Sequence, residues 1–318
     1  MAKKIPPIIK EMKQHKSHEI NYAYEKNISY SQYSMWKKCP KQWALQYREG
    51  HKVYNPSVHT VFGKAFHETF QYYLEVMYEK SGAAADREDI DSMLKTKIRE
   101  HYMDEYKKNN KQHFSQPGEL QEFYNDGVEI LKFLKKNRGK YFSKRGWFLA
   151  GIETKITIAP NPKYPNIFYL GYLDIVMYHE PTNSFKIIDI KTSTKGWNDY
   201  TKKDEEKQFQ LILYKKFFSE QFGVPEKNID VEFMIVRRKV YTEGDFPQKR
   251  VQEFRPPSGK IKVSRATKAV NEFIETCFEG NKYTESVMEP NASKWNCTFC
   301  PYKEDLKLCG LGVNLPKS

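Results

Sequence analysis

Two acidic residues and a lysine interrupt apolar segments of the kind that form buried β-strands. Asp189 and Lys191 lie in the segment FKIIDIK, and Asp174 lies in the preceding segment GYLDIVMY. Alternate residues of a strand project from the same face, so Asp189 and Lys191 are expected to lie side by side. A buried carboxylate without a partner is costly, and the sequence therefore predicts a compensating group here.

A divalent cation would suit a pair of carboxylates on adjacent strands. Mg²⁺ binds oxygen ligands and is commonly held by one or two carboxylates together with water and substrate phosphates. Such an ion lowers the pKa of a bound water, and a nearby ammonium such as that of Lys191 can stabilise the transition state of a phosphodiester. This arrangement predicts hydrolysis of nucleic acid. The alternative interpretation is a simple ion pair between Asp189 and Lys191 on a strand face.

The periodicity of apolar residues predicts the elements that position these side chains. Helical spacing dominates residues 60–145, and β-branched and aromatic segments predict strands over 147–158, 167–178 and 185–191. A helix from Asp204 to Gln221, a strand over 231–240 and a last helix around Ala266–Phe278 are expected to follow. The order of these elements predicts an α/β protein.

Composition suggests how the chain is divided. Residues 1–26 are polar and rich in lysine, which predicts a basic, flexible tail. Residues 27–318 are expected to form a single domain, because no long linker or internal repeat interrupts them. Within it we expect a helical part over 60–145, a catalytic core over 146–280 and a cysteine-containing tail over 285–318.

Four short motifs resemble those of the PD-(D/E)xK nuclease superfamily, and specifically those of its RecB-like branch. In chain order they are G-x-x-x-H at Gly63–His67, G-x-x-D at Gly171–Asp174, D-x-K-T at Asp189–Thr192 and Q-x-x-x-Y at Gln210–Tyr214. The resemblance implies a restriction-endonuclease-like core, in which an αβββαβ mixed sheet is flanked by helices.

The resemblance also implies roles for individual residues. The implied ligands of Mg²⁺ or Mn²⁺ are His67, Asp174, Asp189 and the backbone carbonyl of Ile190. Lys191 is the implied catalytic lysine, and Gln210 and Tyr214 are implied to position substrate beside it and the two catalytic acids. Glu153 occupies the strand in which many relatives carry an acid, and it is expected to have a lesser role. Taken singly, His67 could equally be a packing residue.

The cysteines suggest a second metal centre. An odd number of cysteines, five, argues against a disulfide framework and favours metal ligation or burial. Cys297 and Cys300 form a C-x2-C pair, and Cys309 follows in a tail with little capacity to form a core, which a metal would order more easily than burial. Cys277 lies on an apolar helical stripe and is expected to be buried.

The segment from Ser29 to Pro40 resembles the serine-containing segment, ending in Cys-Pro, of RecB-like nucleases that carry an iron-sulfur cluster. In those relatives one N-terminal and three C-terminal cysteines hold a [4Fe-4S] cluster. The resemblance therefore implies Cys39, Cys297, Cys300 and Cys309 as ligands that join the tail to Cys39. Four thiolates would also suit structural zinc, which remains the alternative.

Charge favours a polyanionic partner. Lys and Arg outnumber Asp and Glu by 53 to 40, which gives a formal net charge of +13. Residues 132–145 and 254–268 are basic and contain no acid. The candidate DNA-contacting residues in the first stretch are Lys135, Lys136, Arg138, Lys140, Lys144 and Arg145. Without a base-reading module, contacts are expected to be with phosphates.

Several classes of protein are excluded by what the sequence lacks. No apolar run reaches the roughly 18 residues that a membrane span needs, and the N-terminal segment does not resemble a secretory signal. We therefore expect a cytoplasmic protein of a prokaryotic or phage-infected cell with no membrane partner. There is no G-x-x-x-x-G-K-[ST] loop, so a helicase or ATPase activity would require a separate partner.

Together these observations predict a metal-dependent DNA exonuclease that acts on single-stranded DNA or DNA ends in recombination, repair or processing. One alternative is an endonuclease or a CRISPR-adaptation-type end-trimming nuclease. Another, from a different class, is an inactive DNA-binding or scaffold subunit of a helicase-nuclease complex. The costly carboxylates in apolar strands favour an active enzyme.

Overall fold

The chain divides into two compact units, each built from separate stretches of sequence. The computed structural model describes residues 5–142, 144–241, 243 and 248–309. The first unit comprises residues 1–16, 55–155 and 172–258, and the second comprises residues 17–54, 156–171 and 259–318. The sequence predicts one domain from residue 27 onward, because no linker-like composition marks the points where the chain passes from one unit to the other.

A mixed β-sheet runs through the first unit. Its strands are β2 (Trp147–Ile158), β3 (Ile167–His179), β4 (Ser184–Ser193), β5 (Ile229–Arg237) and β6 (Val251–Phe254), of which β2 and β3 extend into the second unit. β4 is antiparallel to β3 and parallel to β5, and β6 is antiparallel to β5. β2 pairs with β3. This confirms the predicted α/β fold with a central mixed sheet flanked by helices.

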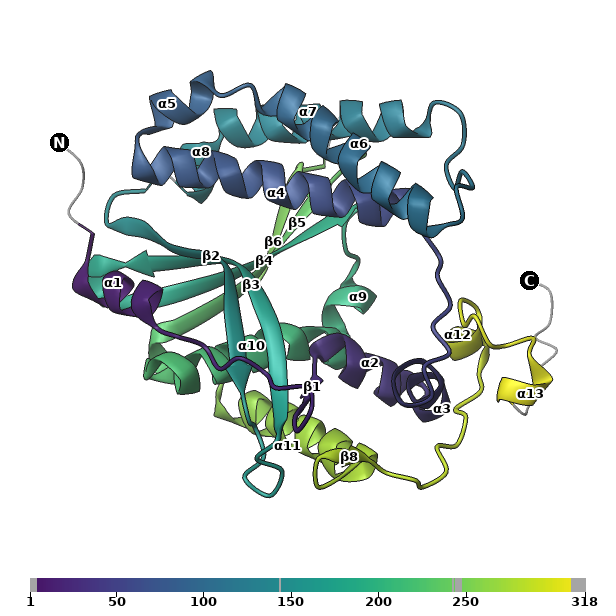
Figure 1. Cartoon of the computed structure of the whole chain (residues 1–318). Coiled ribbons are helices and arrows are strands. Elements are labelled where there is room, and N and C mark those ends of the chain that lie inside the picture. The colour runs from purple at the N-terminus through teal and green to yellow at the C-terminus, as the bar shows by residue number, and fades with distance from the viewer. Residues whose placement is uncertain (1–4, 143, 242, 244–247, 310–318) are drawn as a thin grey trace. The chain divides into compact units, whose positions relative to one another are not determined.

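Helices cover both faces of the sheet in the first unit (Figure 1). One layer contains α4 (Val58–Glu79), α5 (Gly82–Arg87), α6 (Ile90–Lys108), α7 (Glu119–Lys136) and α8 (Arg138–Tyr141). Its core includes Phe62, Phe66 and Phe70 of α4, which pack in one cluster with Ile188 and Ile190 of β4. Because side chains alternate along a strand, Asp189 projects from the opposite face of β4.

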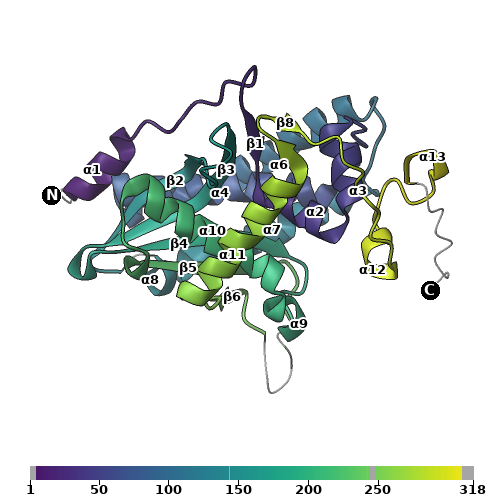
Figure 2. The same ribbon diagram turned by 90° about the horizontal axis from the view of Figure 1, so that it is seen from below.

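Helix α10 (Glu205–Phe222) covers that opposite face, and Figure 2 shows it from below. The helix begins where the sequence predicts, because the Asp204 carboxylate caps it by accepting from the backbone N–H groups of Glu206 and Lys207. It ends at Gly223, whose φ of 66° lies in the left-handed region that favours glycine. Two 3-10 turns, η2 (Glu180–Thr182) and η3 (Glu226–Asn228), and α9 (Asp199–Lys203) complete this part of the unit.

The basic N-terminal segment differs from the predicted flexible tail. Residues 1–4 lie outside the described part of the chain, and α1 (Pro7–Gln14) follows them in the first unit. Pro7 suits the first turn of a helix, where its missing N–H is not needed. Ile9 and Met12 are spaced by one helical turn and are buried, so the helix is held by an apolar stripe that the overall polar composition conceals.

The second unit contains the cysteine-rich tail. Its helices are α2 (Tyr30–Lys38), α3 (Pro40–Trp43), the π-helix η1 (Ala44–Arg48), α11 (Lys260–Cys277), α12 (Lys294–Cys297) and α13 (Leu306–Cys309). Its short strands are β1 (Lys26–Ile28), β7 (Phe278–Glu279) and β8 (Lys282–Tyr283), and β1 pairs in parallel with the start of β3. The rings of Trp43 and Phe273, both fully buried, meet edge to face at 5.5 Å in its core.

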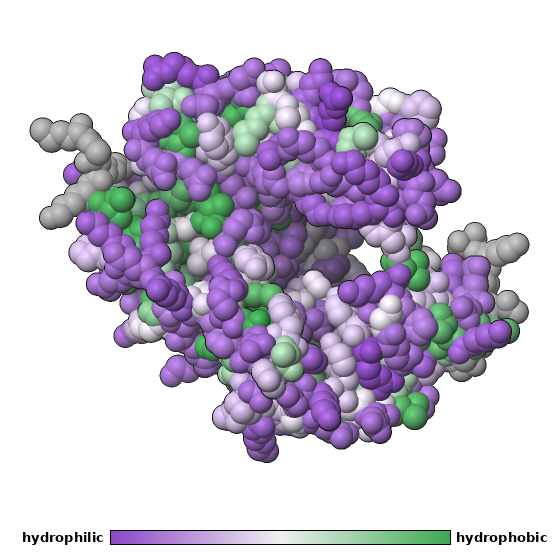
Figure 3. Space-filling model, viewed as in Figure 1, coloured by the Kyte–Doolittle hydropathy of each residue, from purple (hydrophilic) through white to green (hydrophobic). Residues whose placement is uncertain are grey.

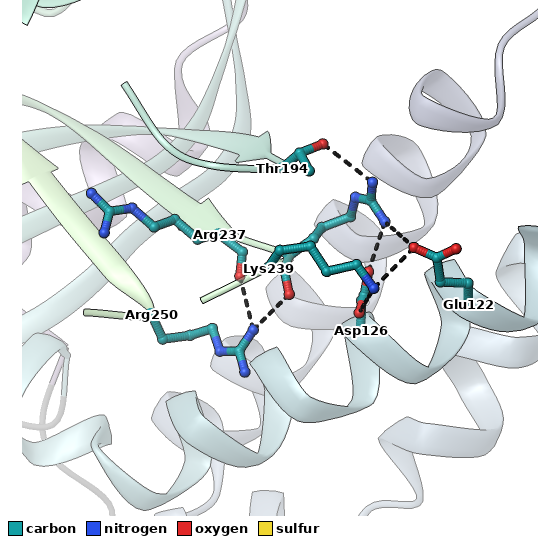
Figure 4. A network of polar contacts seen from close by, with 7 residues as sticks. Glu122, Asp126, Thr194, Arg237, Lys239 and Arg250 are labelled. Atoms are coloured by element: carbon teal, nitrogen blue, oxygen red, sulfur yellow. Dashed lines mark hydrogen bonds and ion pairs between the residues drawn. The ribbon is translucent and has the colours of Figure 1, made fainter. Parts of the chain in front are cut away.

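An ion-pair network joins α7 to the ends of β4 and β5 (Figure 4). The Arg238 guanidinium lies 3.6 Å from the centre of the Phe123 ring and donates to Asp126 at 2.7 Å and to Thr194 Oγ1 at 3.2 Å. Lys239 pairs with Asp126 and with Glu122. The network therefore fastens the segment that directly follows β4, the strand of Asp189 and Lys191.

Figure 3 shows that hydrophilic residues predominate on the face seen there, with hydrophobic residues in small, separate groups. Among the described residues, no helix combines the length and the apolarity that crossing a membrane requires.

The Arg238 network yields a stability prediction. Arg238→Met should lower the free energy of unfolding by about 2–3 kcal/mol, because it removes two hydrogen bonds to a buried guanidinium and leaves Asp126 with less compensation. Lys239→Met is the matched control, because the half-exposed Lys239 side chain should contribute at most about 1 kcal/mol. Urea unfolding of both variants measures the difference. Equal stabilities for the two variants would contradict this assignment.

Candidate active site

Asp174 and Asp189 end the paired segment of β3 and β4. The last pair of this segment is Ile175 with Ile188, and Asp174 and Asp189 come one residue beyond it on their strands. Instead of continuing the ladder, the backbone N–H of Ile190 donates to the Asp174 carboxylate at 2.7 Å. The Asp174 carboxylate is thus held at the end of the paired segment within reach of His67 of α4, and Asp189 lies within reach of Gln210 of α10.

Lys191 and Gln210 contact Asp189 directly. The Asp189 carboxylate, 2% exposed, lies 2.8 Å from Lys191 Nζ and accepts from Gln210 Nε2 at 3.0 Å. Gln210 also donates to the Tyr214 hydroxyl at 3.3 Å. Burial alone would lower the pKa of Lys191, but the charge and hydrogen bond of Asp189 outweigh burial and raise it. Lys191 is therefore held as a cation.

His67 of α4 lies beside Asp174. Its Nδ1 is 3.7 Å from the Asp174 carboxylate, and it forms a hydrogen bond with the backbone of Ile190. Burial lowers the pKa of His67 despite the charge of Asp189, so its imidazole is neutral near pH 7, the form that binds metals. Burial and the charge of Asp189 raise the pKa of Asp174 well above its ordinary value. The positive charge near Asp174 is therefore too small to stabilise its ionised carboxylate.

Glu153 joins this group through an irregular backbone. It is the residue of β2 with a positive φ, 46°, a conformation that non-glycine residues rarely adopt and that costs on the order of 1–3 kcal/mol. The same stretch is tight, because a Cβ at Gly151 would collide with the Thr154 hydroxyl. The irregularity interrupts the alternation of β2 and brings the Glu153 carboxylate close to His67 and Asp174.

Gln71 is a contact residue that the sequence analysis missed. Its side chain, 5% exposed, donates to the Glu153 carboxylate at 2.6 Å and to the backbone carbonyl of Asp174 at 3.1 Å. Gln71 follows His67 by one helical turn, so both reach the same place from one face of α4. That spacing is the signal that could have identified it.

The donor set fits a divalent metal. Ligand atoms of His67, Glu153 and Asp174 lie within 4.8 Å of one another. With Asp189 included, three carboxylates face the single ammonium of Lys191, and a divalent cation would neutralise the excess negative charge. Oxygen and imidazole donors of this kind suit Mg²⁺ or Mn²⁺. Glu153, for which the sequence predicts a lesser role, thus lies among the candidate metal ligands. The Asp189 carboxylate instead pairs with Lys191 and accepts a hydrogen bond from Gln210.

The six candidate DNA-contacting residues of the 132–145 stretch fall into two groups. Lys135 and Arg138 make internal contacts: Lys135 donates to the Asp86 carbonyl, and Arg138 pairs with the Asp86 carboxylate at 2.6 Å. The exposed members are Lys136, Lys140, Lys144 and Arg145. Only these four of the six candidates therefore present their charge mainly to solvent.

In the second unit, four cysteines approach one another. The pKa of the Cys300 thiol is raised by burial and by the nearby thiols of Cys39, Cys297 and Cys309. The Asn291 N–H donates to Cys39 Sγ at 3.4 Å, and the Asn291 side chain donates to the Lys38 carbonyl, which fastens the tail beside α2. Cys277 is fully buried, as its apolar stripe predicts.

Comparison with known proteins identifies the family of this chain. The model of the PD-(D/E)XK nuclease superfamily matches residues 27–304, which include every residue of the site. A search of curated proteins finds no match. A crystal structure of a protein from Eubacterium rectale, described as a candidate exonuclease, is 13% identical with a TM-score of 0.46 and covers 93% of this chain and 92% of that one. Because this family model matches most of its length, the chain belongs to the PD-(D/E)XK nuclease superfamily.

Proposed function

We propose that this protein is a metal-dependent DNA exonuclease of the RecB-like branch, acting on single-stranded DNA or DNA ends in recombination, repair or processing. The observation that carries the proposal is the convergence of four motifs: His67 beside Asp174, and Lys191 and Gln210 beside Asp189. Helix α4 and helix α10 contribute one motif each, and the sheet contributes the other two. Superfamily membership alone would not require His67 or Gln210.

Each residue has a role that follows from its contacts. His67, Glu153 and Asp174 would hold Mg²⁺ or Mn²⁺, with Asp189 and the Ile190 carbonyl as the further ligands that the resemblance implies. The bound ion would supply charge neutralisation of the scissile phosphate and a water of lowered pKa. Lys191, held as a cation by Asp189, is placed to stabilise the developing negative charge. Gln210 and Tyr214 fix the orientation of the Asp189 carboxylate.

We also propose that Cys39, Cys297, Cys300 and Cys309 hold a [4Fe-4S] cluster. Cys39, Cys297 and Cys309 all lie close enough to Cys300 to affect the pKa of its thiol, which supports a shared metal centre. Among the described residues, no three cysteine sulfurs lie within 4.8 Å of one another. Four thiolates would also suit structural zinc, which stays the alternative.

The nuclease proposal predicts a specific loss of activity. Lys191→Ala should lower the rate of Mg²⁺- or Mn²⁺-dependent cleavage of single-stranded DNA by about 10²–10³-fold, because it removes one charge from the transition state. Lys227→Ala, which removes an exposed lysine of η3, is the control and should retain activity. Cleavage of 5′- and 3′-labelled linear strands measures the activity of both variants, and a circular strand tested in parallel distinguishes an exonuclease from an endonuclease. Cutting of the circle would indicate an endonuclease, and full activity of Lys191→Ala would refute the assigned site.

The cluster predicts a metal content that can be measured. Protein purified without oxygen should contain iron and acid-labile sulfide, and Cys39→Ala and Cys300→Ala should lose both, because each removes one ligand. Cys277→Ala is the matched control and should retain the cluster, since this cysteine is a buried core residue. Stoichiometric zinc without iron would overturn the proposal.

A further inference from the structure

Tyr172 is an exposed aromatic residue on a strand whose neighbouring positions are buried. Its side chain is 48% exposed, whereas Gly171 and Leu173 on either side of it are buried. Tyr172 precedes Asp174 by two residues, so the two side chains share one face of β3 with Cα atoms about 6.6 Å apart. The ring therefore stands next to a residue of the metal group.

The groups around Asp174 define what lies beside the ring. The paired part of β3 and β4 ends one residue short of Asp174, and the backbone N–H of Ile190 donates to the Asp174 carboxylate instead. His67 Nδ1 lies 3.7 Å from the same carboxylate, and a carboxylate oxygen of Glu153 lies within 4.8 Å of the ligand atoms of both. The exposed ring thus borders the residues that would hold the metal in the proposed function.

The chemistry around Tyr172 selects the class of ligand. The groups beside Asp174 are polar, namely His67 and Glu153, which with Asp174 would hold a metal that faces a phosphate. A ligand that matches both the ring and these groups must combine a flat, weakly polar face with a phosphate, which is the composition of a nucleotide. Aromatic side chains stack on nucleic-acid bases with little dependence on sequence.

We propose that Tyr172 stacks on the base of the nucleotide beside the scissile phosphate. A base in the interior of a duplex has both faces covered by its neighbours, so this contact requires an unpaired or terminal base. The inference rests on the proposed nuclease function and deepens it by assigning to one side chain, Tyr172, the selection of a strand whose base is unpaired.

Abasic substitution tests the contact directly. Single-stranded oligonucleotides carrying one abasic nucleotide at successive positions are bound to the Asp189→Asn protein, which keeps the strand intact, and affinity is measured by fluorescence anisotropy. We expect one position at which removal of the base weakens binding by about tenfold. Adding Tyr172→Ala or Tyr172→Leu should abolish this position-specific loss, and Tyr172→Phe should restore it.

The controls separate this contact from folding and from the nuclease function. Met103→Ala truncates an exposed side chain of α6 and should leave the abasic profile unchanged. The same abasic profile with and without the Tyr172 ring, or no sensitive position at all, would overturn the stacking proposal. Cleavage of single-stranded DNA by the unmodified protein is scored separately, so its absence would count against the nuclease function.

Discussion

Repulsion between the Asp174 and Asp189 carboxylates is the electrostatic constraint that the rest of the site must satisfy. They lie near each other where the paired segment of β3 and β4 ends, and burial and the charge of Asp189 raise the pKa of Asp174. Lys191 compensates one carboxylate but cannot compensate both. The excess negative charge makes the site suited to a divalent cation, which could neutralise the charge of a bound phosphate.

The surrounding elements hold this unfavourable arrangement in place. Helix α4 brings His67 and Gln71 to the site from one face, and Gln71 anchors the Glu153 carboxylate. The positive φ of Glu153 costs free energy that a regular strand would avoid. Such backbone strain is common at functional sites, where it helps to place a side chain. On the other face, α10 supplies Gln210 to Asp189. Packing of apolar side chains offsets these costs, in the cluster under α4 on one face and between Phe185 and Phe218 of α10 on the other.

Much of this arrangement could be predicted from the sequence, because it follows from local rules. Strand alternation places Asp189 and Lys191 together, and an Asp at the expected helix start sets the beginning of α10. The position of Glu153 could not be predicted in this way, because a positive φ within a strand breaks the alternation on which the inference rests. Gln71 was missed because its contacts join segments far apart in the sequence. The partnership of Arg138 with Asp86 was concealed for the same reason.

Metal-dependent stability tests the central claim most directly. Thermal unfolding of the metal-free protein and of Asp174→Asn is compared in the absence and presence of Mn²⁺. The account predicts that metal-free Asp174→Asn is the more stable protein, because the substitution removes a charge that burial and Asp189 disfavour. It also predicts that Mn²⁺ raises the melting temperature of the unmodified protein and has little effect on the variant. An equal shift by Mn²⁺ in both proteins would contradict the account.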